Sequence, residues 1–109
     1  MHEEIKQAFE DVVLPMIPTN WKFGDSLTIR LEYDPSTGFE ISTGPIGNSA
    51  SDFYLIEDKF KPLLLKLSAQ SRKGLEVSSG FYSVTYNRVT KHLSQRCRWY
   101  VESLAYSLN

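Results

Sequence analysis

Hydrophobic side chains recur along this chain with two different spacings, and each spacing predicts a type of element. Near the start, Ile5, Phe9, Val12 and Val13 lie at helical intervals among charged residues. This pattern predicts an amphipathic helix over residues 3–14. Pro15 lacks the amide that a continuing helix needs, so the helix should end or kink there.

The clearest local pattern is an alternation of apolar and polar residues that predicts a β-hairpin. Apolar side chains alternate from Leu27 to Tyr33 and again at Phe39 and Ile41, with the period of two of a half-buried strand. Residues 34–38 (Asp-Pro-Ser-Thr-Gly) supply the turn between the two runs. Their proline fixes φ at the second turn position, and their glycine can adopt a positive φ.

The following stretch predicts a loop, a central helix and a further extended segment. Glycine, proline and asparagine in residues 43–51 indicate a surface loop, and residues 53–56 read as a short third strand or an extended lead into a helix. Leucines at helical spacing predict the central helix over residues 58–72. Residues 76–89 are rich in β-branched and aromatic residues, which predicts a strand or a bent pair of strands.

The last element is predicted to be a helix that begins at Thr90. Its apolar stripe would consist of Leu93, Cys97, Tyr100, Val101, Leu104 and Leu108. Within this stripe Cys97 is expected to be buried and chemically quiet. The order of elements predicts one α+β domain over residues 1–109, in which N-terminal, central and C-terminal helices pack on a small antiparallel sheet.

Composition narrows the class of protein. No apolar run approaches the roughly 20 residues that span a bilayer, and the first residues are acidic where a secretion signal is basic, so we expect a cytoplasmic protein without a membrane segment. The single cysteine, Cys97, cannot form an internal disulfide, which agrees with a reducing compartment.

The charge of the chain is divided along its length. Residues 1–58 carry eleven acidic side chains and three basic ones, whereas residues 59–109 carry nine basic and two acidic ones. A surface of one sign attracts a partner of the opposite sign and rejects others. The division therefore points to protein or nucleic-acid partners, unless the two halves simply neutralise each other within the fold.

The sequence offers no set of reactive side chains for catalysis. His2 and His92 lie far apart, no zinc-ligand spacing is present, and the glycines at 44 and 47 lack the lysine of a phosphate-binding loop. Acidic residues near the hairpin sit mostly at turns or strand ends, where acids are normally solvated. We therefore expect a protein that is not an enzyme, with no catalytic residues, no metal ligands and no cofactor.

Two binding hypotheses follow from the charge division. In the first, an acidic surface with aromatic anchors docks a basic protein. Its candidate residues are Asp34, Glu40, Asp52, Tyr54, Glu57 and Asp58. In the second, a basic C-terminal helix binds nucleic acid through Lys91, Arg96, Arg98 and Trp99. Nucleic acid is the less favoured partner, because the acidic half would repel it unless it faced away.

The first part of the chain resembles a known family. A leading amphipathic helix, the segment Ile17-Pro18-Thr19-Asn20-Trp21, a hairpin with an aromatic second strand, and Tyr54 ahead of a leucine-rich helix are similar to the YezG-like bacterial immunity proteins. The resemblance covers roughly residues 5–70. It implies a protein that neutralises a cognate nuclease toxin by binding it.

The leading hypothesis is therefore an immunity protein of bacterial competition, of the YezG-like or contact-dependent growth inhibition type, which inhibits a basic toxin domain without catalysis. The alternative is a small nucleic-acid-binding or regulatory module, and size alone also fits a secretion chaperone. The sequence leaves the oligomeric state open.

Overall fold

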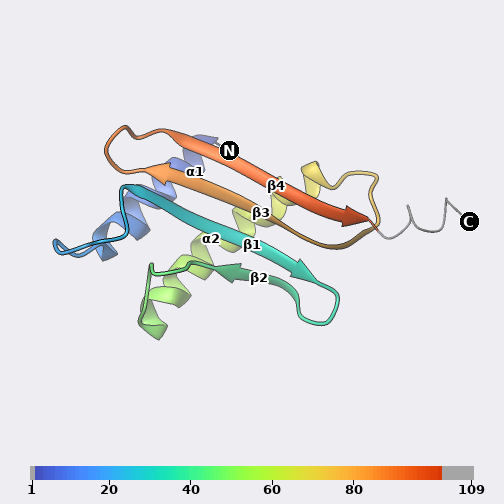
Figure 1. The fold of residues 1–109 in the computed structure, drawn as a ribbon, viewed down its shortest axis with the longest axis horizontal. Coiled ribbons are helices and arrows are strands. Elements are labelled where there is room, and N and C mark those ends of the chain that lie inside the picture. Colours follow the sequence, from blue (N-terminus) through green and yellow to red (C-terminus); the bar gives the residue numbers. More distant parts are fainter. Residues whose placement is uncertain (1, 102–109) are drawn as a thin grey trace, which may run out of the picture.

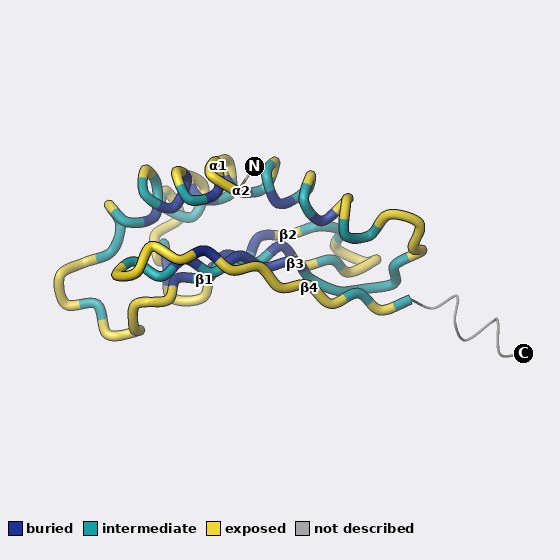
Figure 2. Tube along the Cα trace, turned by 90° about the horizontal axis from the view of Figure 1, so that it is seen from above, coloured by how far each residue is buried: buried dark blue, intermediate teal, exposed yellow. Residues whose placement is uncertain are grey.

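In residues 2–101, the part of the chain that the computed structural model describes, two helical segments cover one face of a four-stranded antiparallel sheet (Figure 1). The elements in chain order are α1 (His2–Ala8), a π-helical turn (Phe9–Val13), a 3-10 turn (Leu14–Met16), β1 (Ser26–Asp34), β2 (Gly38–Ser42), α2 (Ala50–Ser71), β3 (Val77–Asn87) and β4 (Leu93–Val101). The strands lie in the order β2-β1-β3-β4, and both helical segments lie on the same side of them (Figure 2). The α+β class is confirmed.

The first helical segment ends where Pro15 predicts. The backbone N–H of Leu14 donates to the carbonyl of Phe9, five residues back, so the helix widens to π geometry before the 3-10 turn that contains Pro15. Proline cannot supply the next helical hydrogen bond, and the loosened turns are the local response. Of the predicted stripe, Ile5, Phe9 and Val13 are fully buried, and Val12 is partly buried against the same core.

The hairpin is also confirmed. Strands β1 and β2 pair antiparallel from Arg30 with Ser42 to Asp34 with Gly38, and the Asp34 carboxylate accepts hydrogen bonds from the Ser36 backbone N–H and hydroxyl within the turn. The apolar members of β1 face the helices and are buried.

The central helix is longer than the leucine spacing predicts. It begins at Ala50, where the Ser49 hydroxyl accepts the backbone N–H of Asp52 at 3.2 Å, so residues 53–56 are helical and not extended. In the predicted helix over residues 58–72, Pro62 would lie near the first turn, where a proline is tolerated. In the longer α2 it lies in the middle of the helix, on the exposed side. The missing hydrogen bond therefore falls on the solvent-facing surface, where water can satisfy the free carbonyl.

The predicted C-terminal helix is wrong for residues 93–101, which form strand β4. Strand β3 lies inside the sheet between β1 and β4, and β4 satisfies the backbone groups along its second edge, from Tyr86 paired with Leu93 to Val77 paired with Val101. The apolar residues at helical spacing also fit a strand. Leu104 and Leu108 lie outside the described residues.

Cys97 is exposed, which corrects the expectation that it is buried. Cys97 lies on the edge strand β4, where it pairs with Tyr82 of β3. Most residues of β4 are exposed. The side chains that the two helical segments bury on this face belong mainly to β1 and β3.

One aromatic cluster joins both helical segments to the sheet. The Phe9 ring stacks on Tyr86 of β3 at 5.3 Å between centroids and meets Phe60 of α2 edge-on at 4.9 Å. The buried Tyr86 hydroxyl donates to the Glu10 carboxylate at 3.0 Å. Burial first, and this carboxylate second, raise the pKa of Tyr86 above its usual value.

We predict that Tyr86→Phe lowers the free energy of unfolding by about 0.5–1.5 kcal/mol at neutral pH, because one buried hydrogen bond is lost. Above about pH 10 an unfolded tyrosine releases its proton while folded Tyr86 keeps it, so wild-type stability should fall as pH rises and the variant's should fall less. Urea unfolding between neutral and alkaline pH measures both effects. Tyr54→Phe, at an exposed ring, is the matched control and should not move the urea midpoint.

We predict that Cys97 of the folded protein reacts with a thiol reagent at a rate close to that in denaturant, because the side chain is exposed on an edge strand. Absorbance of a released chromophore measures the rate, and Cys97→Ser gives the background. Labelling that requires denaturant would contradict this placement.

Candidate functional site

A hollowed surface lies at one end of the molecule, where loop 17–25, loop 43–49 and the first turns of α2 meet. We call this surface the loop end. Three depressions of about 550, 480 and 290 Å³ follow one another there. The first and second share Met16 and Asp52, and the second and third share Trp21, Phe23 and Pro45. They therefore form one continuous groove, from the helical layer to the uncovered face of the sheet.

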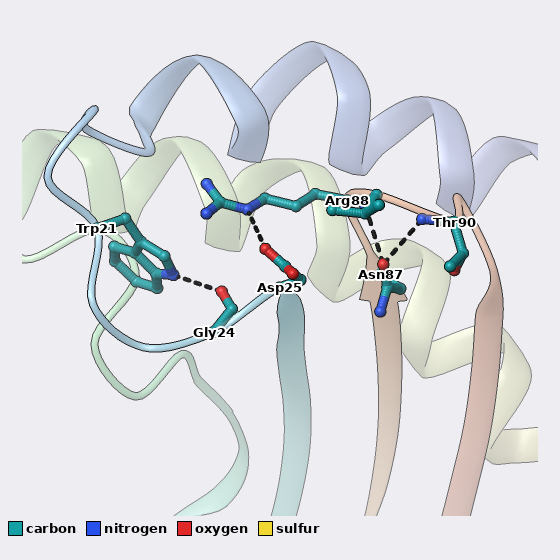
Figure 3. Close-up of polar contacts among 7 residues, drawn as sticks. Trp21, Gly24, Asp25, Asn87, Arg88 and Thr90 are labelled. Atoms are coloured by element: carbon teal, nitrogen blue, oxygen red, sulfur yellow. Dashed lines mark hydrogen bonds and ion pairs between the residues drawn. The ribbon is translucent and has the colours of Figure 1, made fainter.

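Loop 17–25 is held in a defined shape by the side chain of Trp21. Its indole N–H donates to the carbonyl of Gly24 at 2.9 Å (Figure 3). Its ring also meets Phe23 edge-on at 5.0 Å between centroids. Gly24 has a φ of 84°, a conformation that glycine adopts without strain. The loop thus holds an aromatic pair against the groove.

A second contact ties this loop to the turn between β3 and β4. Arg88 binds Asp25 twice: its backbone N–H donates to the Asp25 carbonyl at 2.9 Å and its Nε to the carboxylate at 3.1 Å (Figure 3). The turn is itself fixed by Asn87, whose side-chain oxygen accepts the N–H groups of Val89 and Thr90, both at 2.9 Å. Loop 17–25 is therefore held at its end by the Asp25–Arg88 pair and within its length by the Trp21–Gly24 hydrogen bond.

Loop 43–49 forms the opposite wall and is equally constrained. The buried Thr43 hydroxyl donates to the Ile46 carbonyl at 2.7 Å. Gly47 has a φ of 66°, and a Cβ there would lie 2.9 Å from a methyl carbon of Ile56. This wall packs directly against α2, so the groove is set by the fold and does not depend on a mobile segment.

The loop end exposes large apolar side chains beside acidic ones. Phe23, Tyr54 and Leu55 are 65%, 59% and 56% exposed. Asp11 and Asp52 line the groove together with Leu55. Exposed aromatic and aliphatic side chains around a depression, with a charged rim, are typical of a protein-binding surface.

The predicted partner-binding residues do not form one contiguous surface. Asp52, Tyr54, Glu57 and Asp58 share the first half of α2, at or beside the loop end. Asp34 and Glu40 belong to the hairpin, and the rise of about 3.4 Å per residue along β1 places its turn roughly 27 Å from the loop end. Hydrogen bonds from Ser36, the hydroxyl first, lower the pKa of Asp34, which ties this carboxylate to its own turn.

The predicted nucleic-acid-binding residues are separated as well. Trp99 faces the helical layer, where its indole N–H donates to the Ser71 hydroxyl at 3.0 Å and its ring packs against Gly80. Arg96 and Arg98 occupy the alternate positions of β4 and so point to the opposite face of the sheet. Lys91 lies in the preceding turn with a φ of 63°. These four residues therefore do not form the basic helical surface that the sequence predicts.

Phe23 and Leu55 are not among the residues predicted from the sequence, and Trp21 enters there only within the segment that resembles the immunity proteins. Exposure of a hydrophobic residue cannot be read from its identity, but the sequence Trp-Lys-Phe-Gly just before a clear strand was an available signal for an aromatic loop. Within residues 2–101 no group of three histidine, cysteine or acidic side chains is arranged to hold a metal ion.

Comparisons with protein-family models, with curated proteins and with solved structures gave no match to this chain. Among the described residues, no helix is both long and apolar enough to cross a bilayer.

We predict that Trp21→Phe loosens loop 17–25, because it keeps an aromatic ring but removes the donor to Gly24. The lost hydrogen bond should cost about 0.5–1.5 kcal/mol of local stability. Trypsin cleavage after the exposed Lys22 should therefore become faster, as measured by mass spectrometry of the native protein. The control is Trp99→Phe, which loses its own hydrogen bond at a distant site and should leave cleavage after Lys22 unchanged.

Proposed function

We propose that this chain is an immunity protein that binds a basic toxin domain, a nuclease, through its loop end and neutralises it without catalysis. The observation that carries the proposal is a preformed groove lined by the exposed side chains of Phe23 and Leu55, with the exposed Tyr54 next to Leu55 on α2. A few large side chains that enter pockets of the partner supply most of the binding energy in protein complexes.

The rigidity of the loop end supports a tight complex. The Trp21–Gly24 hydrogen bond and the Asp25–Arg88 pair fix loop 17–25 before a partner arrives. A surface that is already ordered loses little conformational entropy on binding, so more of the contact energy contributes to affinity. An inhibitor that must hold a toxic enzyme for long periods needs this property.

The charge of the loop end supports a basic partner. Asp11 and Asp52 line the groove, and Asp58 is exposed on α2 beyond it. Nucleases that bind the phosphate backbone carry positive surfaces. Acidic side chains at the rim of an interface accelerate encounter with such a surface and disfavour other partners.

The resemblance to YezG-like immunity proteins agrees with this placement. The segment Ile17-Pro18-Thr19-Asn20-Trp21 carries much of the resemblance, and all of its residues except Thr19 line the middle depression of the groove. The segment that resembles these proteins in sequence thus also forms a wall of the proposed docking site.

We predict that Phe23→Ala and Leu55→Ala each weaken binding to the cognate toxin by about thirtyfold or more, the effect of losing an interface anchor. The assay is bacterial growth during co-expression with the toxin domain encoded beside this chain's gene, followed by calorimetry with a catalytically inactive toxin. Val89→Ala truncates another exposed hydrophobic residue, 68% exposed in the β3–β4 turn, and should protect like the wild type.

Reversing Asp52 and Asp58 to Lys tests the electrostatic part. It should slow association more than it speeds dissociation, and added salt should reduce the difference from wild type. If the folded variants Phe23→Ala, Leu55→Ala and the Asp52/Asp58 reversal all protected fully, the proposed site would be wrong. The absence of inhibition of any neighbouring toxin would contradict the immunity function itself.

A further inference from the structure

The face of the sheet opposite the helices is not covered by any described element (Figure 2). Alternate residues of all four strands point to this face, which we call the open face. Its central row, defined by the strand register, runs from Glu40 on β2 through Glu32 on β1 and Phe81 on β3 to Arg98 on β4.

The open face is divided by charge along this row. Its acids, Glu40 and Glu32, lie on the β2–β1 side, whereas Arg96 and Arg98 lie on the β4 side. Phe81 lies between the two sides, and the guanidinium of Arg30 rests 4.1 Å from its ring centroid. The face is therefore dipolar across the strands.

Each side of the open face is locally repulsive. Glu32 and Glu40 are direct cross-strand partners, an arrangement in which like charges destabilise a sheet. Arg30 lies 3.9 Å from Glu32 and relieves part of this repulsion. Within residues 2–101 neither Glu40 nor Arg98 forms an ion pair. An opposing surface that carried bases over β2 and acids over β4 would relieve both sides.

A second copy of this chain has that surface when it faces the first across a two-fold axis parallel to the strands and midway between β1 and β3. This rotation places β4 of each copy over β2 of the other. Arg98 of one copy then meets Glu40 of its partner, and the same pair forms again by symmetry. An axis across the strands would instead place bases over bases.

Association through the sheet edges is less favourable. If β4 paired with β4 of another copy, Arg96 and Arg98 would lie beside the same two arginines of the partner, and charged edge residues of this kind oppose such pairing. Strand β2 is only five residues long. The open face is therefore the better surface for self-association.

We propose that two copies of this chain pack their open faces together, with reciprocal Arg98–Glu40 pairs and Phe81 near the centre of the interface. Four strands about 4.8 Å apart, with about seven residues each at a rise of about 3.4 Å, give a face of roughly 450 Å² per copy. The pair would bury on the order of 900 Å², the size of a weak and reversible interface. Of the loop end, only the depression that reaches Arg30 and Glu32 borders this interface. Tyr54 and Leu55 belong to α2, on the opposite side of the sheet, so each copy would keep these side chains accessible.

The test is sedimentation equilibrium of the full chain up to several hundred micromolar. The wild type should show a monomer–dimer equilibrium that added salt weakens. Arg98→Glu and Glu40→Arg should each weaken the dimer by about tenfold or more, because like charges then face each other twice. The double variant, and an equimolar mixture of the two single variants, should recover it, because opposite charges again meet at both positions.

Lys66→Glu is the control, since it reverses a charge on the exposed side of α2 and should leave the dimer unchanged. A wild type that stays monomeric throughout, or single variants that associate like the wild type, would overturn the proposal. Binding of a single-stranded RNA oligonucleotide that Arg98→Glu abolishes would also overturn it, in favour of nucleic acid on this face. Growth protection is scored separately, so the toxin-binding proposal can fail or succeed independently.

Discussion

The packing of Phe9 between Tyr86 and Phe60 is the contact on which the remaining arrangement depends. These three rings come from the first helical segment, β3 and α2, and they fix both helical segments on one face of the sheet. The π-helical turn places Phe9 and Val13 on the buried side while the chain approaches Pro15. The loop that follows must then leave from the end of the sheet, where it meets the start of α2.

This geometry explains why the groove forms at that end. Loop 17–25 connects the helical layer to β1, and loop 43–49 connects β2 back to the helical layer, so both crossings occur side by side over the start of α2. Crossings between layers expose loop side chains that neither layer can bury. Hydrogen bonds from Trp21 and Arg88 hold the first crossing, and Thr43 holds the second.

The hairpin, the first helix and β3 could be predicted because local spacing and burial agree in them. Leu27, Ile29 and Leu31 alternate in sequence and are buried in the structure. Strand β4 could not be predicted in this way, because its apolar residues also fit a helical spacing and the deciding factor is the free edge of β3. The start of α2 was missed because Pro62 looked like a helix start. Of the site, Asp52 and Tyr54 were anticipated, whereas Phe23 and Leu55 required knowledge of which residues the helical layer leaves uncovered.

The charge division of the sequence acquires a different meaning in the fold. Acidic residues of the first half lie in the first helical segment, in α2 beside the groove, in loop 17–25 and the hairpin turn, and on β1 and β2, where Glu32 and Glu40 face the open side. Among the basic residues of the second half, only those of β4 reach the open face. Side chains alternate along this strand, so Trp99 faces the helices while Arg96 and Arg98 face away from them.

The charge division along the sequence thus produces two different surfaces: an acidic rim around exposed aromatic side chains, and a dipolar sheet face. A positive surface attracted to the first would meet Arg96 and Arg98 on the β4 side of the second, whereas Glu32 and Glu40 lie on its β2–β1 side. Substitutions on α2 change the first surface alone and substitutions on β4 change the second alone, and the charged residues of β4 oppose pairing of the sheet through this edge.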